Sequence, residues 1–242
     1  MKELSLSGSS HPFVFGLKDG SSIALGYIPA AITFGFIAQT VHLTSVETLL
    51  MSLFVFAGAA QYMALSLLAA GTGAFEIIFT TFIVNIRHFL MSASLNEKTL
   101  PGRPLQKAGY AFGITDEVFA VTSMKEGTIS SAYIYGVFLI SYVSWASFSV
   151  AGHSIGDLLP SILQQSLTFA LYALFIALLT PSLKKHRKVI YLACSAAVMN
   201  SLFSLWLAEG WSLILSVILS AGFIEWAAPH SLEKTQNEKE GA

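Results

Sequence analysis

The feature that most constrains this chain is a series of apolar stretches long enough to cross a lipid bilayer. A spanning helix needs about 20 mainly apolar residues to cross ~30 Å of hydrocarbon. Such stretches lie at 22–40, 48–70, 74–92, 129–151, 162–182, 188–207 and 211–228. A shorter apolar stretch, at 108–124, contains Asp116 and Glu117. Because these stretches are too long and too uniformly apolar for barrel strands, they predict an all-α integral membrane protein.

The composition argues against several soluble classes. Only 11% of the residues are charged and 54% are hydrophobic, whereas soluble domains are roughly 25% charged. A net charge of -1 provides no basic surface for nucleic acid. The single cysteine, Cys194, has no intrachain disulfide partner, and no Cys/His cluster has zinc spacing. We therefore expect no nucleic acid, metal or cofactor as a ligand.

One short motif is typical of a hydrolase but lacks the necessary context. Residues 152–156 (Gly-His-Ser-Ile-Gly) match the nucleophile-elbow pattern around Ser154. That pattern needs a strand, a tight turn and a helix, with Asp and His partners downstream. The chain has no predicted strands, nor does it contain a phosphate-binding or dinucleotide-binding glycine motif. We therefore predict that the protein is not an enzyme and has no catalytic residues.

The ends of the chain are more polar than the region between them. Residues 1–20 do not resemble a cleavable signal peptide, and we expect an N-terminal tail there. Residues 229–242 are polar and charged, which predicts a solvated cytoplasmic tail. Between them, 21–228 is predicted to be a single polytopic membrane domain.

The basic loops leave two topologies open. Lys and Arg are enriched in cytoplasmic loops, and 184–188 is the clearest basic loop. A second basic loop lies at 93–107. It would face the outside of the cell, against the rule, if the N-terminus is cytoplasmic and three complete spans precede the loop. One solution is that an early stretch and 108–124 are both re-entrant, which gives about six spans. The other is that 108–124 crosses the membrane, which gives about eight spans and a loop that breaks the rule.

Glycine and proline favour irregular helices in the N-terminal half. Pro29 lies inside an apolar stretch, where it removes a backbone donor. Gly35 and Gly58 also lie inside such stretches, and we predict hinges or broken helices at these three positions. Non-helical backbone at membrane depth survives only when it is buried in protein or lines a cavity. The alternative is that Gly and Pro are simply common in membrane helices.

Ionisable side chains inside apolar stretches are costly in a bilayer and need an explanation. On a regular helix over 74–92, Glu76, Thr80 and Arg87 share one face. Arg87 can either snorkel or pair with a carboxylate, or it can contact a substrate. The adjacent carboxylates of Asp116 and Glu117 cannot face the same way, so one can pair with Arg87 while the other stays free. The alternative is that both lie at the membrane surface in contact with water.

Four segments follow one another along the chain: 26–35, 56–61 (Phe-Ala-Gly-Ala-Ala-Gln), 85–91 (Asn-Ile-Arg-His-Phe-Leu-Met) and 115–120 (Thr-Asp-Glu-Val-Phe-Ala). In this order and spacing they resemble the AzlC family of branched-chain amino acid transport proteins. The resemblance covers most of 20–230. It implies a multi-pass permease of the cytoplasmic (inner) membrane that exports valine, leucine or isoleucine together with a small hydrophobic AzlD-like subunit. Its motif members in this chain are Gln61, Asn85, Arg87, His88, Asp116 and Glu117.

These residues together predict a site for a zwitterion. Such a ligand needs an anion-binding element, a cation-binding element and an apolar pocket. Arg87 or the N-terminus of a half-helix would take the carboxylate, and Asp116 or Glu117 the ammonium. Aromatic side chains would wall the pocket: Phe34, Phe56 and Phe82. Our hypothesis is alternating access around the broken early segments, coupled to protons through a carboxylate. The alternative is an uncoupled channel or facilitator for another small anion or zwitterion.

Overall fold

The computed structural model describes residues 11–156, 187–207 and 209–227, with isolated positions between 162 and 183. The predicted span at 162–182 and the polar tail at 229–242 therefore lie almost wholly outside the described residues. Three described helices are long and apolar enough to cross a membrane, and the prediction of an all-α membrane protein is confirmed. The helices are α1 (Pro12–Thr40), α2 (Ser45–Phe54), α3 (Gly58–Ala69), α4 (Ala74–Lys98), α5 (Pro104–Phe112), α6 (Asp116–Ser123), α7 (Ser131–Ile155), α9 (Arg187–Phe203) and α10 (Glu209–Ala227).

The chain divides into two compact units. The first contains Met1–Ala69 and Val84–Leu171, and the second contains Ala70–Ile83 and Tyr172–Ala242. Helix α4 contributes its start to the second unit and the rest of its length to the first. The substrate-binding residues predicted from the sequence belong to the first unit, except for Phe82 of the predicted pocket wall, which belongs to the second.

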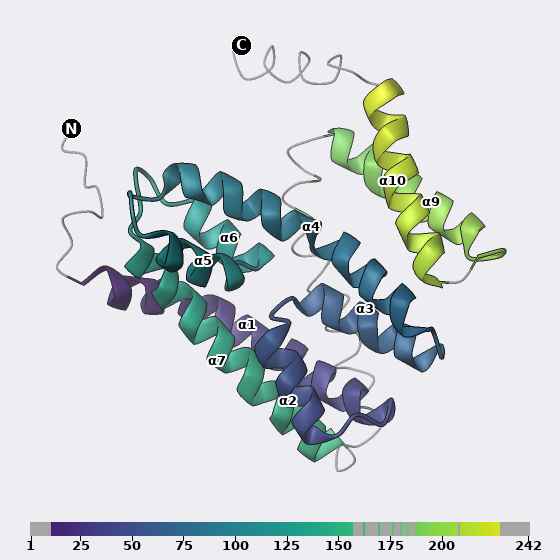
Figure 1. The fold of residues 1–242 in the computed structure, drawn as a ribbon, viewed down its shortest axis with the longest axis horizontal. Coiled ribbons are helices and arrows are strands. Elements are labelled where there is room, and N and C mark those ends of the chain that lie inside the picture. The colour runs from purple at the N-terminus through teal and green to yellow at the C-terminus, as the bar shows by residue number, and fades with distance from the viewer. Residues whose placement is uncertain are drawn as a thin grey trace. The chain divides into compact units, whose positions relative to one another are not determined.

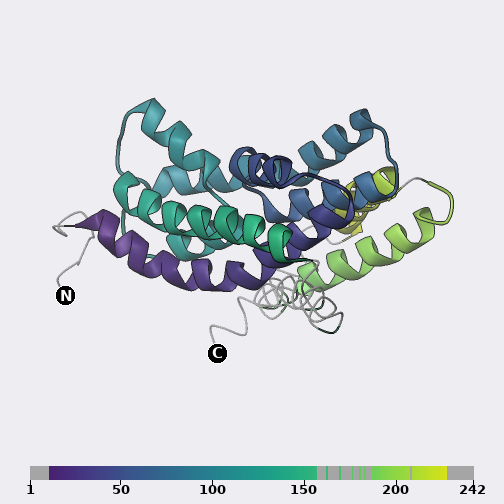
Figure 2. The ribbon, with the colours of Figure 1, turned by 90° about the horizontal axis from the view of Figure 1, so that it is seen from below.

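Helices α1 and α7 form the frame of the first unit and run side by side in the same direction (Figures 1 and 2). Glycines allow their backbones to approach closely. A Cβ atom on Gly16 would overlap the backbone of α7 near its start, and one on Gly35 would overlap it near its end. Gly136 and Gly152 of α7 meet the α1 backbone in the same way. We call the end with Pro12 and Ser131 the N-terminal end of this pair, and the other its C-terminal end.

Helix α1 is longer than expected and is not broken. It begins at Pro12, so residues 12–20, which we expected within a polar tail, are helical. Pro29 lies inside the helix, and neighbouring helices donate hydrogen bonds to carbonyls on either side of it. Ser144 Oγ donates to Ala24 O at 2.7 Å, and the Tyr62 hydroxyl donates to Ala30 O at 2.6 Å. Such bonds are one way in which membrane helices tolerate proline.

The predicted span 48–70 is a hairpin of two short helices, α2 and α3, with a break at 55–57. The chain just before α2 lies at the C-terminal end of the α1–α7 pair, where a His153 ring nitrogen lies 2.8 Å from Leu43 O. Near its end, α2 has reached the middle of α7, where the Tyr142 hydroxyl donates to Leu53 O at 2.8 Å. Helix α3 then runs back towards the C-terminal end. With a rise of 1.5 Å per residue, α2 is only about 15 Å long and cannot cross a bilayer.

The predicted stretch 108–124 is a second hairpin, formed by α5 and α6 with a break at 113–115. Helix α5 begins at the N-terminal end of the α1–α7 pair, where the Tyr135 hydroxyl donates to Gln106 O at 2.9 Å. Helix α6 returns to that end, where Lys98 Nζ donates to the carbonyl of Ser123 at 2.6 Å. This hairpin therefore enters from the end opposite to the first hairpin.

The basic loop at 93–107 and Lys125 lie at the N-terminal end of the first unit. Lys125 Nζ lies 2.7 Å from Asp19 Oδ2 near the start of α1. In the loop at 93–107, Thr99 forms a parallel bridge with Ile129, just before α7 begins. The basic loop thus lies at the same end as the start of α1. Of the two topologies left open by the sequence, this arrangement agrees with the one in which an early stretch and 108–124 are both re-entrant, and the early stretch is 48–70.

The second unit contains the pair α9 and α10, which lie side by side (Figure 1). Lys188 and Glu225 form an ion pair, and Ser212 Oγ donates to Asn200 Oδ1 at 2.9 Å. The second unit also includes the start of α4.

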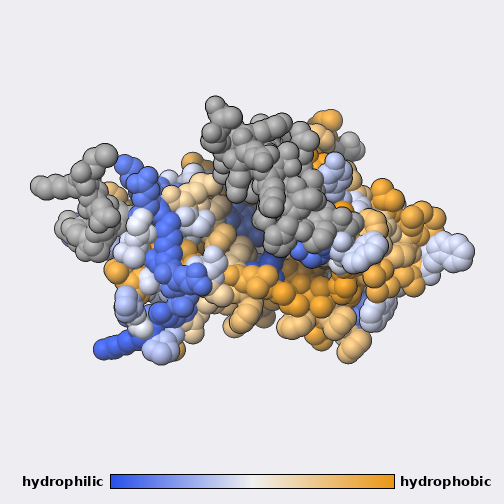
Figure 3. Space-filling model, turned by 90° about the horizontal axis from the view of Figure 1, so that it is seen from above, coloured by the Kyte–Doolittle hydropathy of each residue, from blue (hydrophilic) through white to orange (hydrophobic). Residues whose placement is uncertain are grey.

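Large apolar side chains are exposed along the described helices, as expected for a surface in contact with lipid. Phe75 and Phe89 of α4 are 75% and 76% exposed, and Trp226 of α10 is 81% exposed. Figure 3 shows apolar side chains over much of the face in view and hydrophilic side chains gathered in a band.

Candidate functional site

The breaks of the two hairpins meet the same aromatic face of α7. Phe56 lies in the break between α2 and α3, and Phe112 is the last residue of α5. The Phe56 ring lies 5.9 Å from the ring of Phe138 and 5.1 Å from that of Tyr142, centroid to centroid. The Phe112 ring lies 6.2 Å from each of the same two rings. Two hairpins that enter from opposite ends therefore turn back at the same depth.

The start of α6 carries a charged pair next to this break. Thr115 caps the helix by accepting a hydrogen bond from the backbone N–H of Val118 at 3.3 Å. Asp116 Oδ2 lies 3.0 Å from Arg87 Nη1, and the two side chains are 34% and 39% exposed. The partial positive charge of a helix N-terminus favours carboxylates there. The structure thus pairs Arg87 with Asp116. For Arg87 the sequence left open either a carboxylate partner or snorkelling on one hand, or contact with a substrate on the other, and the observed pair is the first of these.

Glu117 points to a different partner. The Tyr27 hydroxyl donates to Glu117 Oε2 at 2.6 Å, and its oxygen lies 2.7 Å from Thr115 Oγ1. Because the Tyr27 proton goes to the carboxylate, the Thr115 hydroxyl donates to the Tyr27 oxygen. Within the described part of the chain, no Lys, Arg or His forms an ion pair with Glu117. With histidine counted as neutral, one positive and two negative groups give this cluster a net formal charge of -1.

Gln61 and Trp145 present unpaired polar atoms beside the other hairpin. Gln61 is completely buried, and both atoms of its amide lack a partner among the described residues, as does Trp145 Nε1. The Trp145 ring lies against Gly58, the first residue of α3, where a Cβ atom would be 3.1 Å from it. Gln61 lies one turn further along the same face of α3. Buried polar groups are nearly always hydrogen-bonded, so these atoms have the character of a binding surface.

Tyr27 and Trp145 connect the remaining predicted residues to this site. Their rings lie 5.2 Å apart. Tyr27 also contacts Phe56, at 6.2 Å, and Trp145 stacks on Phe34, at 5.9 Å. The structure therefore brings Phe34, Phe56 and Glu117 around one pair of aromatic side chains.

The polar residues of α4 are divided between the two units. Arg87 lies in the first unit with Asn85 and His88, which are partly buried, and Asn85 Oδ1 is buried without a partner among the described residues. Glu76 and Thr80 lie in the second unit instead. There their oxygens approach Gly210, where a Cβ atom would lie within 2.8 Å of both. Phe82, which we expected in a pocket wall, is 62% exposed.

The three predicted hinge positions differ in their surroundings. Gly58 begins α3 directly after the break at 55–57. Pro29 and Gly35 lie within the continuous helix α1. Gly35 serves close packing there, because any side chain would overlap Ser149 O of α7.

The hydrolase-like motif lies in a helix. Ser154 is part of the last turn of α7, and its hydroxyl donates to Val150 O at 2.9 Å. It therefore lacks the strand and tight turn of a nucleophile elbow. Among the described residues there is no group of three or more His, Cys, Asp or Glu side chains that could hold a metal ion.

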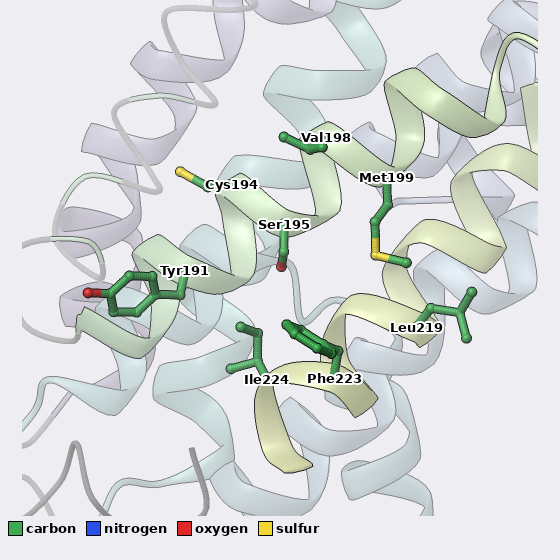
Figure 4. A pocket seen from close by; sticks show the side chains of 8 residues that line it. All are labelled: Tyr191, Cys194, Ser195, Val198, Met199, Leu219, Phe223 and Ile224. Carbon is green, nitrogen blue, oxygen red and sulfur yellow. The ribbon is translucent and has the colours of Figure 1, made fainter. Parts of the chain in front are cut away.

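The second unit contains an open groove of about 680 Å³ between α9 and α10 (Figure 4). None of the residues predicted to bind substrate lines it, and its surface is almost wholly apolar: Tyr191, Cys194, Ser195, Val198, Met199, Leu219, Phe223 and Ile224. It offers no charged group to a zwitterion.

Sequence reasoning missed Tyr27 and Trp145, which connect the two hairpins. Tyr27 lies within the segment 26–35, in which we assigned a role to Pro29 but none to Tyr27. Trp145 lies after residue 130, where no motif was recognised. The available signal was its spacing, since 135, 138, 142 and 145 are all aromatic and share one helix face.

The chain is similar in sequence to several known membrane proteins. The sequence model of a family described as "AzlC protein" matches residues 22–159, more than half of the chain. An uncharacterized membrane protein of Archaeoglobus fulgidus is 35% identical over 70% of this chain and 75% of its own length. "Inner membrane protein YgaZ" of Escherichia coli is 32% identical over 80% of this chain and 81% of its own length. "Branched-chain amino acid transport protein AzlC" of Bacillus subtilis is 25% identical over 69% of this chain and 66% of its own length. No solved structure matches the chain.

Proposed function

The chain belongs to the AzlC family, and we propose that it is a multi-pass permease that exports branched-chain amino acids across the cytoplasmic membrane. The name of the Bacillus subtilis relative supports this class of substrate. The name of the Escherichia coli relative supports the inner membrane as the location. The small AzlD-like partner subunit and the outward direction of transport belong to the same proposal.

One observation carries the proposal: two broken hairpins from opposite ends of the fold turn back at one polar and aromatic cluster. Transporters commonly bind substrate near the bilayer midplane, between discontinuous helices whose ends offer partial charges. The cluster has the three elements that a zwitterion with an apolar side chain needs. It offers carboxylates at Asp116 and Glu117, positive groups at Arg87 and the half-helix N-termini, and the aromatic rings around Phe56.

The same arrangement provides a route to alternating access. Each hairpin extends from one end of the α1–α7 pair only as far as the middle, so movement of one hairpin exposes the cluster to one side. The positive-inside rule assigns the N-terminal end, with Lys98 and Lys125, to the cytoplasm. Proton coupling would use a carboxylate of the cluster, and Glu117 is the one that lacks a cationic partner among the described residues.

A flux assay tests the proposal. Cells or proteoliposomes that contain the chain and its small partner are loaded with valine, and efflux is followed for Arg87→Lys, Asp116→Asn and Glu117→Gln. Each variant removes a bidentate donor or a charge, and we expect efflux to fall at least tenfold, whereas the exposed control Glu97→Gln retains it. Unchanged efflux in all three variants refutes the site. A rate of efflux that does not change when a proton gradient is imposed would instead identify an uncoupled facilitator.

A further inference from the structure

The two hairpins share a short pattern at their breaks. In the first, 56–61 reads Phe-Ala-Gly-Ala-Ala-Gln, and in the second, 112–117 reads Phe-Gly-Ile-Thr-Asp-Glu. Both phenylalanines contact Phe138 and Tyr142. The residue five positions later is Gln61 in one hairpin and Glu117 in the other. Gln61 is the fourth residue of α3 and Glu117 the second residue of α6, so each lies in the first turn or so of a half-helix, and the two half-helices belong to hairpins that enter from opposite ends.

The starts of the two half-helices, α3 and α6, differ in charge. With histidine counted as neutral, the start of α6 has a net formal charge of -1, because Arg87 pairs with Asp116, while among the described residues Glu117 is hydrogen-bonded to the neutral Tyr27. The start of α3 has no formal charge, and its first N–H groups carry the partial positive charge of a helix N-terminus. One hairpin therefore favours a cation and the other an anion.

Hydrogen-bond donors at the start of α3 fit a carboxylate. The residues at 57–60 are Ala, Gly, Ala and Ala, whose side chains cannot themselves accept hydrogen bonds from the backbone N–H groups of the first turn. Gln61 adds a fully buried amide, and Trp145, whose six-membered ring lies against Gly58, adds a buried indole N–H on its five-membered ring. Neither group has a partner among the described residues. Unpaired buried donors beside a helix N-terminus are what an anionic group requires.

We propose that the two hairpins divide the amino acid between them. The carboxylate binds at the start of α3 to the amide of Gln61 and the indole N–H of Trp145, and the ammonium binds to Glu117. In this arrangement the Arg87–Asp116 pair positions α6 and does not contact the substrate. The assignment rests on the proposed function, because it presupposes an α-amino acid as the ligand.

Ligands that lack one charged group separate the two subsites. L-valine carries both groups, 3-methylbutanoate lacks the ammonium, and isobutylamine lacks the carboxylate. Dissociation constants are measured from ligand-dependent thermal stabilisation of the purified full chain. Gln61→Met should weaken valine and 3-methylbutanoate about 10- to 100-fold, the usual effect of losing a hydrogen bond to a charged group. It should leave isobutylamine unchanged. Glu117→Gln should show the opposite selectivity.

Controls keep the result independent of folding. Gln106→Met makes the same change at an exposed position on α5 and should alter no dissociation constant. Trp145→Phe keeps an aromatic ring and removes only the indole N–H, so it should also weaken valine and 3-methylbutanoate selectively. If wild type binds valine but Gln61→Met and Trp145→Phe do not change its affinity, the carboxylate subsite is refuted while the proposed function stands. If wild type binds none of the three ligands, the proposed function fails and this assignment fails with it.

Discussion

The hydrogen bond from Tyr27 to Glu117 gives a quantitative test of the cluster. Tyr27→Phe removes the hydroxyl that donates to Glu117 Oε2 at 2.6 Å and keeps the ring that contacts Trp145. A hydrogen bond to a charged group contributes about 1.5–3 kcal/mol, whereas one to a neutral group contributes about 0.5–1.5 kcal/mol. Tyr62→Phe is the matched control, because its hydroxyl donates at the same distance to a neutral acceptor, Ala30 O. We therefore expect Tyr27→Phe to lower the free energy of unfolding by about 1 kcal/mol more than Tyr62→Phe.

A double-mutant cycle isolates the interaction itself. Free energies of unfolding are measured by SDS titration of purified protein in mixed micelles. Combining Tyr27→Phe with Glu117→Met should give a coupling energy of about 1.5–3 kcal/mol, because either change alone already removes the bond. Combining Tyr62→Phe with Glu117→Met should be additive within about 0.5 kcal/mol, since the two side chains share no partner. A Tyr27–Glu117 coupling energy as small as that of the control would refute the hydrogen bond from Tyr27 to Glu117, and with it the chain of hydrogen bonds from Thr115 through Tyr27 to Glu117.

Two further predictions concern packing and topology. Gly35→Ala should lower the free energy of unfolding by about 1–3 kcal/mol, because the new Cβ atom overlaps the backbone of α7. Gly26→Ala on the same helix meets open space and should be neutral or stabilising by up to about 1 kcal/mol in the same titration. In a background without the native cysteine, Arg103→Cys and Glu126→Cys should react with an impermeant maleimide from the cytoplasmic side, whereas Thr44→Cys should react only from the other side. Labelling of all three from one side would contradict the opposed hairpins.

Hydropathy was sufficient to predict the fold class, because any helix exposed to lipid must be apolar along its whole length. It was insufficient to separate a span from a hairpin, because both bury the same apolar residues. The stretch 48–70 is as apolar as a span, and 108–124 is apolar on both sides of Asp116 and Glu117, yet each folds back at a short break. Their breaks fall at Val-Phe-Ala and Gly-Ile-Thr sequences, whereas Pro29, the strongest local signal, lies in an unbroken helix. Tertiary hydrogen bonds from Tyr62 and Ser144 support the backbone around that proline, and no local pattern predicts them.

The charged residues of the site were found because charge is rare in apolar stretches. Arg87, Asp116 and Glu117 stood out for that reason alone. The sequence left open which carboxylate pairs with Arg87, because Asp116 and Glu117 are adjacent and either could form the ion pair. The structure resolves the choice through Tyr27, whose hydroxyl bonds to Glu117 and leaves Asp116 to the arginine. An uncharged side chain on a distant helix thus determines which carboxylate remains uncompensated.

The aromatic face of α7 explains how two helix breaks can coexist at the centre of one unit. A break frees backbone groups that a bilayer cannot solvate, so the protein itself must cover them. Tyr142 bonds to the carbonyl of Leu53 near the end of α2, and its ring contacts both Phe56 and Phe112. Phe138, one turn earlier, contacts the same two rings and lies against Gly113, where no Cβ atom would fit. One helix face therefore covers both breaks, which ties the depth at which each hairpin turns to the spacing of aromatic residues on α7.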